Sequence, residues 1–301
     1  MTTPFRQHKD KQPSTYFVRD RQSQQEMLRL TIQDHMLTTA MGGVLPEQPD
    51  PAVFRRVLDI GCGTGGWIIE AAQSYPTMSL VGIDISQRMV EHAQKQAVTQ
   101  KVADRITFQV MDALTLLEFP SAHFDLVNLR LGVSYVRKWD WPKVLSEMVR
   151  VTLPGGVVRI TDNDILHQSN SPALTQLDEI AINTLYRAGH LFEQVGSGLT
   201  AHLAGLLAQH GCQQVQTKAY MMEFQAGTTE GQAYYEDMAH VFQTTRPFIR
   251  KWGCEPENYD EIYQHAIEEM QKPTFHSTWN LLSAWGHVPG QNLTQGWVLI
   301  P

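Results

Sequence analysis

The stretch that decides the fold is VLDIGCGTGG, residues 57–66. Its first four residues suit a buried parallel strand, and the rest form a turn that contains four glycines. A helix-like segment, residues 67–73, follows the turn. Glycines let the backbone take positive φ and approach a ligand closely. Such a turn opens onto the carboxyl edge of a parallel sheet, where α/β proteins bind ligands, so the stretch favours a nucleoside-bearing cofactor.

Two cofactor patterns fit this turn. Gly61, Gly63 and Gly66 match the GxGxxG fingerprint of dinucleotide binding. Asp59, Gly61, Gly63 and Gly65 also match D-x-G-x-G-x-G, which resembles the S-adenosylmethionine (SAM) site of class I methyltransferases. A carboxylate at Asp59 would repel a pyrophosphate, whereas it suits a cofactor that carries an ammonium and a sulfonium. Asp59 therefore favours the second pattern.

Four further buried strands are predicted along the chain. The first of them ends in Asp84, a carboxylate that can accept both hydroxyls of a ribose. Enzymes that use NAD share such an acid, so Asp84 alone does not separate the two cofactors. The four strands occupy residues 79–84, 106–111, 124–129 and 157–160.

Taken in order, these motifs resemble the class I SAM-dependent methyltransferases, especially small-molecule enzymes similar to the ubiquinone/menaquinone group. The resemblance covers about residues 54–225, and five ordered motifs make it specific. It implies an α/β fold with a Rossmann-like, seven-stranded, mostly parallel sheet, an N-terminal helix and a helical cap made by C-terminal insertions. The motifs are VLDIGCGTG at 57–65, GIDIS at 82–86, MDA at 111–113, FDLVNLR at 124–130 and LPGG at 153–156.

The resemblance also implies a cofactor site, with SAM as methyl donor and S-adenosylhomocysteine as product. Asp59 and the backbone of residues 61–63 would hold the methionine part, and Asp84 the ribose. Asp112 and Ala113 would face the adenine, and an N-terminal residue would close over the methionine end. The residues expected to contact the cofactor are Tyr16, Asp59, Gly61, Cys62, Gly63, Asp84, Ile85, Met89, Asp112, Ala113, Asn128 and Leu129.

The length, net charge and cysteine content of the chain indicate what kind of protein it is. The chain has 301 residues, 42% of them hydrophobic, which is enough for a sizeable core, and its net charge of −7 does not favour binding to nucleic acid. Three widely separated cysteines form no disulfide or zinc pattern, so we expect a reducing, cytoplasmic location. No apolar run approaches the ~20 residues of a membrane span. We expect a monomer or homodimer that acts on a small-molecule substrate.

Four regions are expected along the chain. Residues 1–52 form an N-terminal arm and covering helix, and residues 53–225 form the SAM-binding core, with a helical insertion at about 165–198. Residues 226–274 form a helical cap, and residues 275–301 the last strand and tail. The segments between the fifth and the last predicted strand are together rich in Phe, Tyr, Met and Trp, which favours an apolar or aromatic acceptor.

The residues after the fifth predicted strand offer a candidate general base and candidate metal ligands. His167 follows the fifth predicted strand, where a loop can reach the acceptor, and a histidine is a common proton acceptor near neutrality. His276 and Tyr135 are weaker candidates. The acids Asp162 and Asp164 suit hard cations. The preceding strand offers Asn128 where metal-dependent relatives carry an acid, so no metal is expected.

The sequence thus predicts a SAM-dependent methyltransferase, class 2.1.1, that transfers a methyl group to a small, apolar or aromatic metabolite by in-line displacement. Two alternatives remain. One is a non-catalytic SAM-binding or scaffolding protein. The other is an NAD-dependent oxidoreductase, which explains neither Asp59 nor the LPGG segment.

Overall fold

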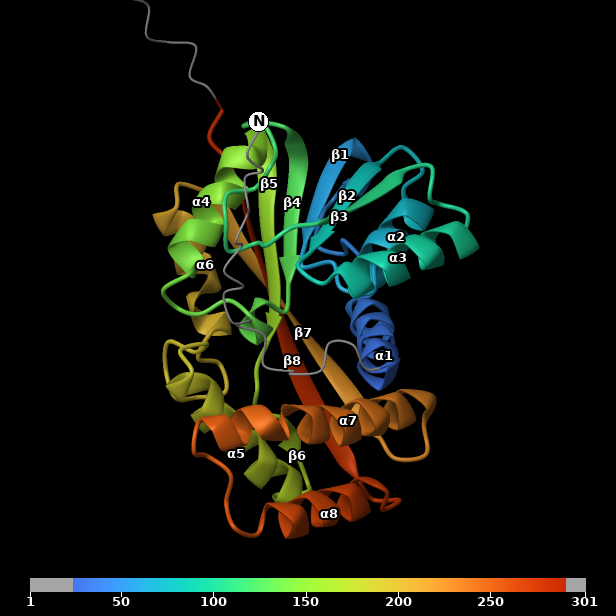
Figure 1. Ribbon diagram of the computed structural model, residues 1–301, viewed down its shortest axis with the longest axis vertical. Coiled ribbons are helices and arrows are strands. Elements are labelled where there is room, and N and C mark those ends of the chain that lie inside the picture. The colour runs from blue at the N-terminus through green and yellow to red at the C-terminus, as the bar shows by residue number, and fades with distance from the viewer. Residues whose placement is uncertain (1–23, 291–301) are drawn as a thin grey trace, which may run out of the picture.

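One mostly parallel sheet forms the centre of the protein in the computed structural model, which describes residues 24–290 (Figure 1). The strand order is β3-β2-β1-β4-β5-β8, with β5 and β6 on one edge of β8 and β7 on the other. Strands β1 to β5 are parallel, and β8 is antiparallel to its neighbours. The strands are β1 Arg56–Ile60, β2 Ser79–Asp84, β3 Ile106–Val110, β4 Phe124–Arg130, β5 Thr152–Asn163, β6 Gln168–Ser169, β7 Gln213–Gln225 and β8 His276–His287.

The order of the strands reverses beside β1, which pairs with β2 on one edge and with β4 on the other. The connection from β1 to β2 and the connection from β4 to β5 therefore lie on opposite faces of the sheet. At such a switch point the loops diverge and leave a crevice at the carboxyl ends of the strands. The glycine turn after β1 opens into this crevice.

Helices cover both faces of the sheet, as the long apolar runs of its strands require. Helices α2 and α3 pack on one face, and α4 and α6 on the other (Figure 1). Ser86 caps α3, because its hydroxyl accepts a hydrogen bond from the backbone N–H of Met89. These helices are α2 Gly66–Ser74, α3 Gln87–Thr99, α4 Trp141–Val151 and α6 Leu203–Gln209.

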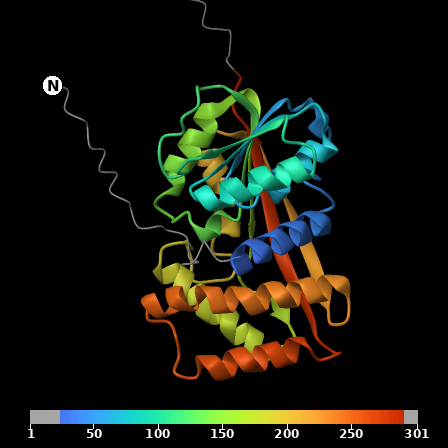
Figure 2. The same ribbon diagram turned by 45° about the vertical axis from the view of Figure 1, so that its right-hand side comes forward.

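A second apolar cluster lies beyond the carboxyl edge of the parallel strands. The long strands β7 and β8 extend past that edge, and helices α5, α7 and α8 pack against the extended halves (Figure 2). Tyr220, Phe224 and Trp279 from the two strands contribute to this cluster. The helices of this cap are α5 Pro172–Arg187, α7 Thr229–Lys251 and α8 Tyr259–Met270.

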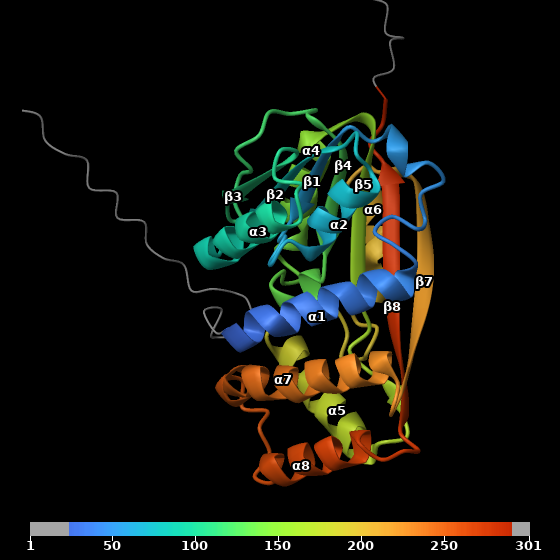
Figure 3. The same cartoon turned by 90° about the vertical axis from the view of Figure 1, so that its right-hand side faces the viewer.

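Helix α1, Gln24–Met41, lies between the sheet and the cap (Figure 3). It packs against α7 and also contacts α2 and β7. Met36, Leu37 and Met41 place its apolar side in the cap cluster. Helix α1 therefore covers the crevice at the end of β1.

The expected elements and the observed ones agree closely, with one difference in the sheet. Seven strands were expected, and the described residues contain eight. The additional strand, β6, is only two residues long, so it has no alternating pattern from which a strand could be predicted. The N-terminal covering helix was expected within residues 1–52; α1 occupies Gln24–Met41, and residues 1–23 lie outside the described residues.

Candidate functional site

The glycine turn after β1 adopts a backbone that only glycine takes readily. Gly61, Gly63 and Gly65 have φ of +70°, +52° and +84°, and the Cys62 N–H donates to the Ile83 carbonyl across the turn. A Cβ on Gly61 would lie 2.6 Å from Tyr135 Oη, whereas above Gly63 nothing lies within 4 Å. The turn is therefore packed at its first glycine and open at its second.

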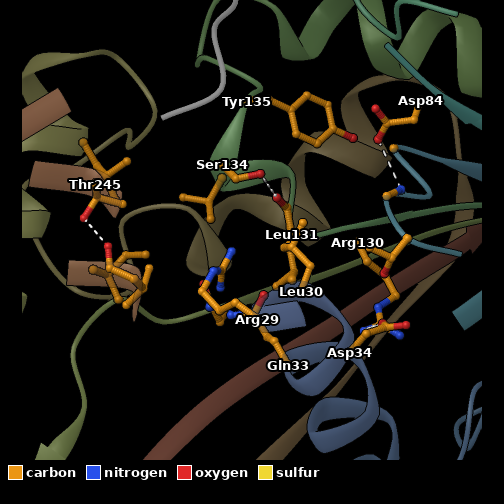
Figure 4. Close-up of a pocket in the computed structure, with 18 of the residues that line it drawn as sticks. Arg29, Leu30, Gln33, Asp34, Asp84, Arg130, Leu131, Ser134, Tyr135 and Thr245 are labelled. Carbon is orange, nitrogen blue, oxygen red and sulfur yellow. Dashed lines mark hydrogen bonds and ion pairs between the residues drawn. The ribbon is translucent and has the colours of Figure 1, made fainter. Parts of the chain in front are cut away.

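Asp84, at the end of β2, is tied to this turn. Its Oδ2 accepts a hydrogen bond from the Gly63 N–H at 3.1 Å, and its Oδ1 accepts one from the Ser86 N–H at 2.7 Å. Figure 4 shows the carboxylate beside the turn, with the Tyr135 ring close by. These two bonds fix the Asp84 carboxylate at the mouth of β2.

Asp59 sits at the base of the same crevice and is only 4% exposed. Its Oδ1 accepts a hydrogen bond from Asn128 Nδ2 at 2.8 Å, and Asn128 in turn accepts one from Arg159. Burial raises the pKa of Asp59 to about 7, and the Asn128 hydrogen bond opposes this shift only in part. A buried carboxyl of this kind gains from a cationic ligand, which favours its ionised form.

Helix α1 supplies a further wall of the crevice. Arg130, the last residue of β4, pairs with Asp34 at 2.6 Å and donates to Thr38 Oγ1 at 3.1 Å. Arg29 bonds to Asp237 on α7 at 2.9 Å, so α1 is joined both to the sheet and to the cap. Figure 4 shows this edge of α1 facing the cavity.

One continuous cavity of about 280 Å³ runs between these walls. This volume is close to the lower end of small-molecule sites, roughly 300–1,000 Å³. One end is lined by the glycine turn and by carboxylates of the sheet edge. The other end, beneath the cap, is mainly apolar, and its wall includes Leu131, Ile165, Leu185, Met238, Val241, Phe242, Phe248, Ile249 and Trp279.

His167 lies in the wall at the apolar end and is held by α5. Its Nδ1 lies 2.9 and 3.0 Å from the two carboxylate oxygens of Asp178, and its backbone N–H donates to Asp178 as well. The two side chains are 6% and 1% exposed. Within residues 24–290, His167 Nε2 has no hydrogen-bond partner.

Most residues expected at the site line the cavity. Asn128 and Leu129 do not: Asn128 lies behind Asp59, and Leu129 points into the core of the sheet, because alternate residues of β4 face opposite sides. Tyr16 lies outside the described residues. The expected residues that line the cavity are Asp59, Gly61, Cys62, Gly63, Asp84, Ile85, Met89, Asp112, Ala113 and His167.

Several lining residues were not predicted. Arg130 had a usable signal, because it ends β4 and so lies at the carboxyl edge of the sheet. Asp34 and Arg29 had none, since their place depends on how α1 docks. Asp178 had none either, because nothing in the sequence joins it to His167.

The two acids considered for a metal have other partners. Asp162 is fully buried and accepts a hydrogen bond from the Val133 N–H at 2.9 Å, and Asp164 accepts one from the Thr200 hydroxyl. Burial raises the pKa of Asp162 to about 7. Across residues 24–290 no group of three or more His, Cys, Asp or Glu side chains could hold a metal ion. The same residues contain no helix long and apolar enough to span a bilayer.

Comparisons with known proteins agree with this arrangement. Residues 57–156 match a family model described as a methyltransferase domain. The chain is 27% identical over 265 residues to 27-O-demethylrifamycin SV methyltransferase of Amycolatopsis mediterranei, which covers 88% of this chain and 81% of that protein. It is 37% identical over 101 residues to demethylmenaquinone methyltransferase of Symbiobacterium thermophilum, which covers 33% of this chain and 39% of that protein.

A solved structure shares the fold. Phosphoethanolamine N-methyltransferase 2 of Haemonchus contortus, in complex with S-adenosyl-L-methionine, is 21% identical with a TM-score of 0.54. The match covers 93% of this chain and 61% of that one, and at this identity it supports the fold alone. Residues 57–156 thus match a methyltransferase domain, and the five ordered motifs and the reversal of strand order at β1 resemble the class I, SAM-dependent methyltransferases.

Proposed function

We propose that the protein transfers a methyl group from SAM to a small, apolar or aromatic metabolite by in-line displacement. The observation that carries this proposal is the single cavity that joins the glycine turn to an apolar compartment beneath the cap. A donor at the turn and an acceptor beneath the cap would then lie in the same cavity, where in-line transfer can align them.

The walls of the cavity fit the donor. The open space over Gly63 admits a ligand close to the backbone, and Asp59 and Asp84 offer carboxylates to its ammonium and its ribose hydroxyls. Asp112 and Ala113 also line the cavity and would face the adenine, and the side chains of Ile85 and Met89 would give it apolar contact. When bound there, SAM supplies a methyl group already activated by its sulfonium.

The chain's own residues then have three tasks. They align the acceptor with the methyl group, keep water out and remove a proton where the acceptor carries one. Alignment alone can lower the barrier by about 7–11 kcal/mol in favourable cases. Helix α1 and the cap form walls of the cavity, and Leu30, Phe242 and Phe248 give these walls an apolar surface.

The charges of the cavity favour a neutral acceptor. Two cations, Arg29 and Arg130, are among the described lining residues, and each already pairs with a carboxylate, Asp237 and Asp34 respectively. A phosphate or carboxylate on the acceptor would have to displace one of these partners. The two relatives are methyltransferases named for 27-O-demethylrifamycin SV and for demethylmenaquinone, both small molecules.

A transfer assay tests the proposal. Purified protein is incubated with SAM labelled in its methyl group and with a panel of aromatic, terpenoid and keto-acid acceptors, and NMR locates the methyl group in any product. We expect transfer to at least one apolar acceptor, and none by an Asp84→Ala variant. If the protein binds SAM but transfers nothing, it is a SAM-binding or scaffolding protein. NADH formation without methyl transfer would instead support the oxidoreductase alternative.

A further inference from the structure

Asp178 holds His167 in one orientation. It accepts hydrogen bonds from both the backbone N–H and the ring Nδ1 of His167, at 2.9 to 3.0 Å. The ring also packs against Trp279 on β8 and Tyr234 on α7, with centroids 5.0 and 5.6 Å away. The imidazole is thus fixed by contacts from three different elements.

This geometry also fixes the tautomer. A carboxylate only accepts hydrogen bonds, so the neutral ring carries its proton on Nδ1 and its lone pair on Nε2. Nε2 is buried, has no partner among the described residues, and belongs to a side chain in the cavity wall. The sequence contains a second buried histidine, His190, whose Nε2 also has no described partner, but His190 does not line the cavity.

The other titratable groups near the His167 ring form hydrogen bonds to other residues. The Tyr234 hydroxyl lies 3.2 Å from Ser277 Oγ, and burial raises its pKa well above the usual value. Asp164, on the loop before His167, accepts a hydrogen bond from Thr200. Asp178 is therefore the charged group that bonds to His167.

We propose that His167 and Asp178 form a dyad that removes the proton from a hydroxyl of the acceptor, so that the enzyme makes a methyl ether on a phenol or enol. This deepens the proposed function by naming the acceptor atom, and it rests on that function. His167 is the catalytic residue, and Asp178 is a positioning residue that sets its tautomer.

The step balances in atoms and charge. The hydroxyl proton passes to Nε2, an oxygen electron pair forms the new C–O bond, and the C–S bond breaks with its pair left on sulfur. The products are the methyl ether, S-adenosylhomocysteine and an imidazolium, which the Asp178 carboxylate stabilises until its proton reaches solvent. Carbon acceptors such as an indole need little help of this kind, so a dyad in this place favours oxygen.

The first experiment examines the dyad without an acceptor. Nitrogen-15 NMR of histidine-labelled protein bound to S-adenosylhomocysteine, at mildly alkaline pH, reports which ring nitrogen of each histidine carries a proton. We expect His167, assigned by loss of its signals in His167→Asn, to be protonated on Nδ1 and bare on Nε2. A proton on Nε2 with a bare Nδ1 would overturn the proposal, whatever the activity assays give.

The second experiment uses matched acceptors and variants. The aromatic probes 1-naphthol, 1-naphthylamine and indole offer oxygen, nitrogen and carbon to the same cavity. In His167→Asn, the amide can replace the Nδ1–H bond to Asp178 while Nε2 is lost, so we expect unchanged SAM affinity and melting temperature with kcat on 1-naphthol lowered roughly 10²–10⁴-fold. Asp178→Asn should lower kcat through the wrong tautomer, with KM nearly unchanged.

His190→Asn is the matched control, because it removes a buried imidazole outside the cavity wall, and its kcat should stay near that of the parent. Methylation of 1-naphthylamine or indole but not of 1-naphthol would contradict the dyad. So would full kcat on 1-naphthol in His167→Asn. If a protein that binds SAM transfers to none of the probes, the result counts against the proposed function, and the NMR measurement decides the dyad separately.

Discussion

Asp59 shows how a single buried residue can couple cofactor binding to pH. With a pKa of about 7, its carboxyl is largely protonated below neutrality in the free protein. A cationic ligand binds better to the ionised form and lowers this pKa. The affinity for SAM should therefore rise as pH increases through about 7 and then level off.

We predict that calorimetric titrations with SAM between about pH 5.5 and about pH 8.5 will show this rise, approaching tenfold per pH unit at the acid end. Asp59→Asn should bind more weakly and lose this part of the pH dependence. The titration of the ligand's own amine is common to both proteins, so the ratio of their affinities isolates Asp59. A ratio that stays constant with pH would contradict the assignment.

The sequence predicted those cavity residues that lie in or directly after a strand motif. Asp59, Asp84 and Asp112 follow directly from the strand ends, so their place in the cavity could be expected. Asp34 and Asp178 could not, because Asp34 meets the distant Arg130 only through the docking of α1, and Asp178 meets His167, 11 residues before it, only through the way α5 folds back. Pairs of that kind have no periodic or local signature.

Helix α1 docks on the glycine turn through one close contact. A Cβ on Gly66, the first residue of α2, would clash with Asp34 Oδ2, so the glycine makes room for the Asp34–Arg130 ion pair. Gly66 has no positive φ that would strain another residue. A substitution there acts mainly through the position of α1.

We predict that Gly66→Ala displaces Asp34 and weakens SAM binding, while the overall fold is kept. Gly205→Ala on α6 is a matched control, because nothing lies within 4 Å of its Cβ and alanine favours a helix by up to about 1 kcal/mol. Calorimetry with SAM and thermal unfolding of both variants separate the two effects. Equal SAM affinity in Gly66→Ala and the parent would show that α1 does not shape the cofactor site.

Element positions were largely predictable, because amphipathic and buried runs carry periodic signals. Helix α5 lies within the helical insertion expected at about 165–198, α8 lies within the cap expected at 226–274, and β8 lies within the last segment, expected at 275–301. The way these elements assemble was harder to predict. The sequence does not reveal that α5, α7 and α8 share one apolar cluster with the far halves of β7 and β8.

For the molecule as a whole, a buried polar network joins α1 to the cap. Arg29 is 2% exposed and bonds to Glu26 and Asp237, and Gln33 donates to the second oxygen of Asp237. Arg29 and Gln33 also line the cavity. The network therefore ties the closure of the cavity to the packing of α1 on α7.

We predict that Asp237→Ala, which removes one partner of a buried ion pair, lowers the free energy of unfolding by about 3 kcal/mol. The control is Asp260→Ala, which breaks an ion pair with Arg246 on the exposed surface and should leave stability nearly unchanged. Urea unfolding measures both. Similar stability of the two variants would mean that the α1–α7 network does not hold the cap in place.

The central claim is that SAM binds against the turn after β1, with its ribose held by Asp84. The most direct measurement is a calorimetric titration of SAM into the parent protein and into Asp84→Ala, with NAD⁺ titrated into the parent as a comparison. We expect SAM to bind the parent, to lose at least tenfold in affinity in the variant, and NAD⁺ not to bind. Equal SAM affinity in the two proteins, or binding of NAD⁺ in place of SAM, would contradict the account.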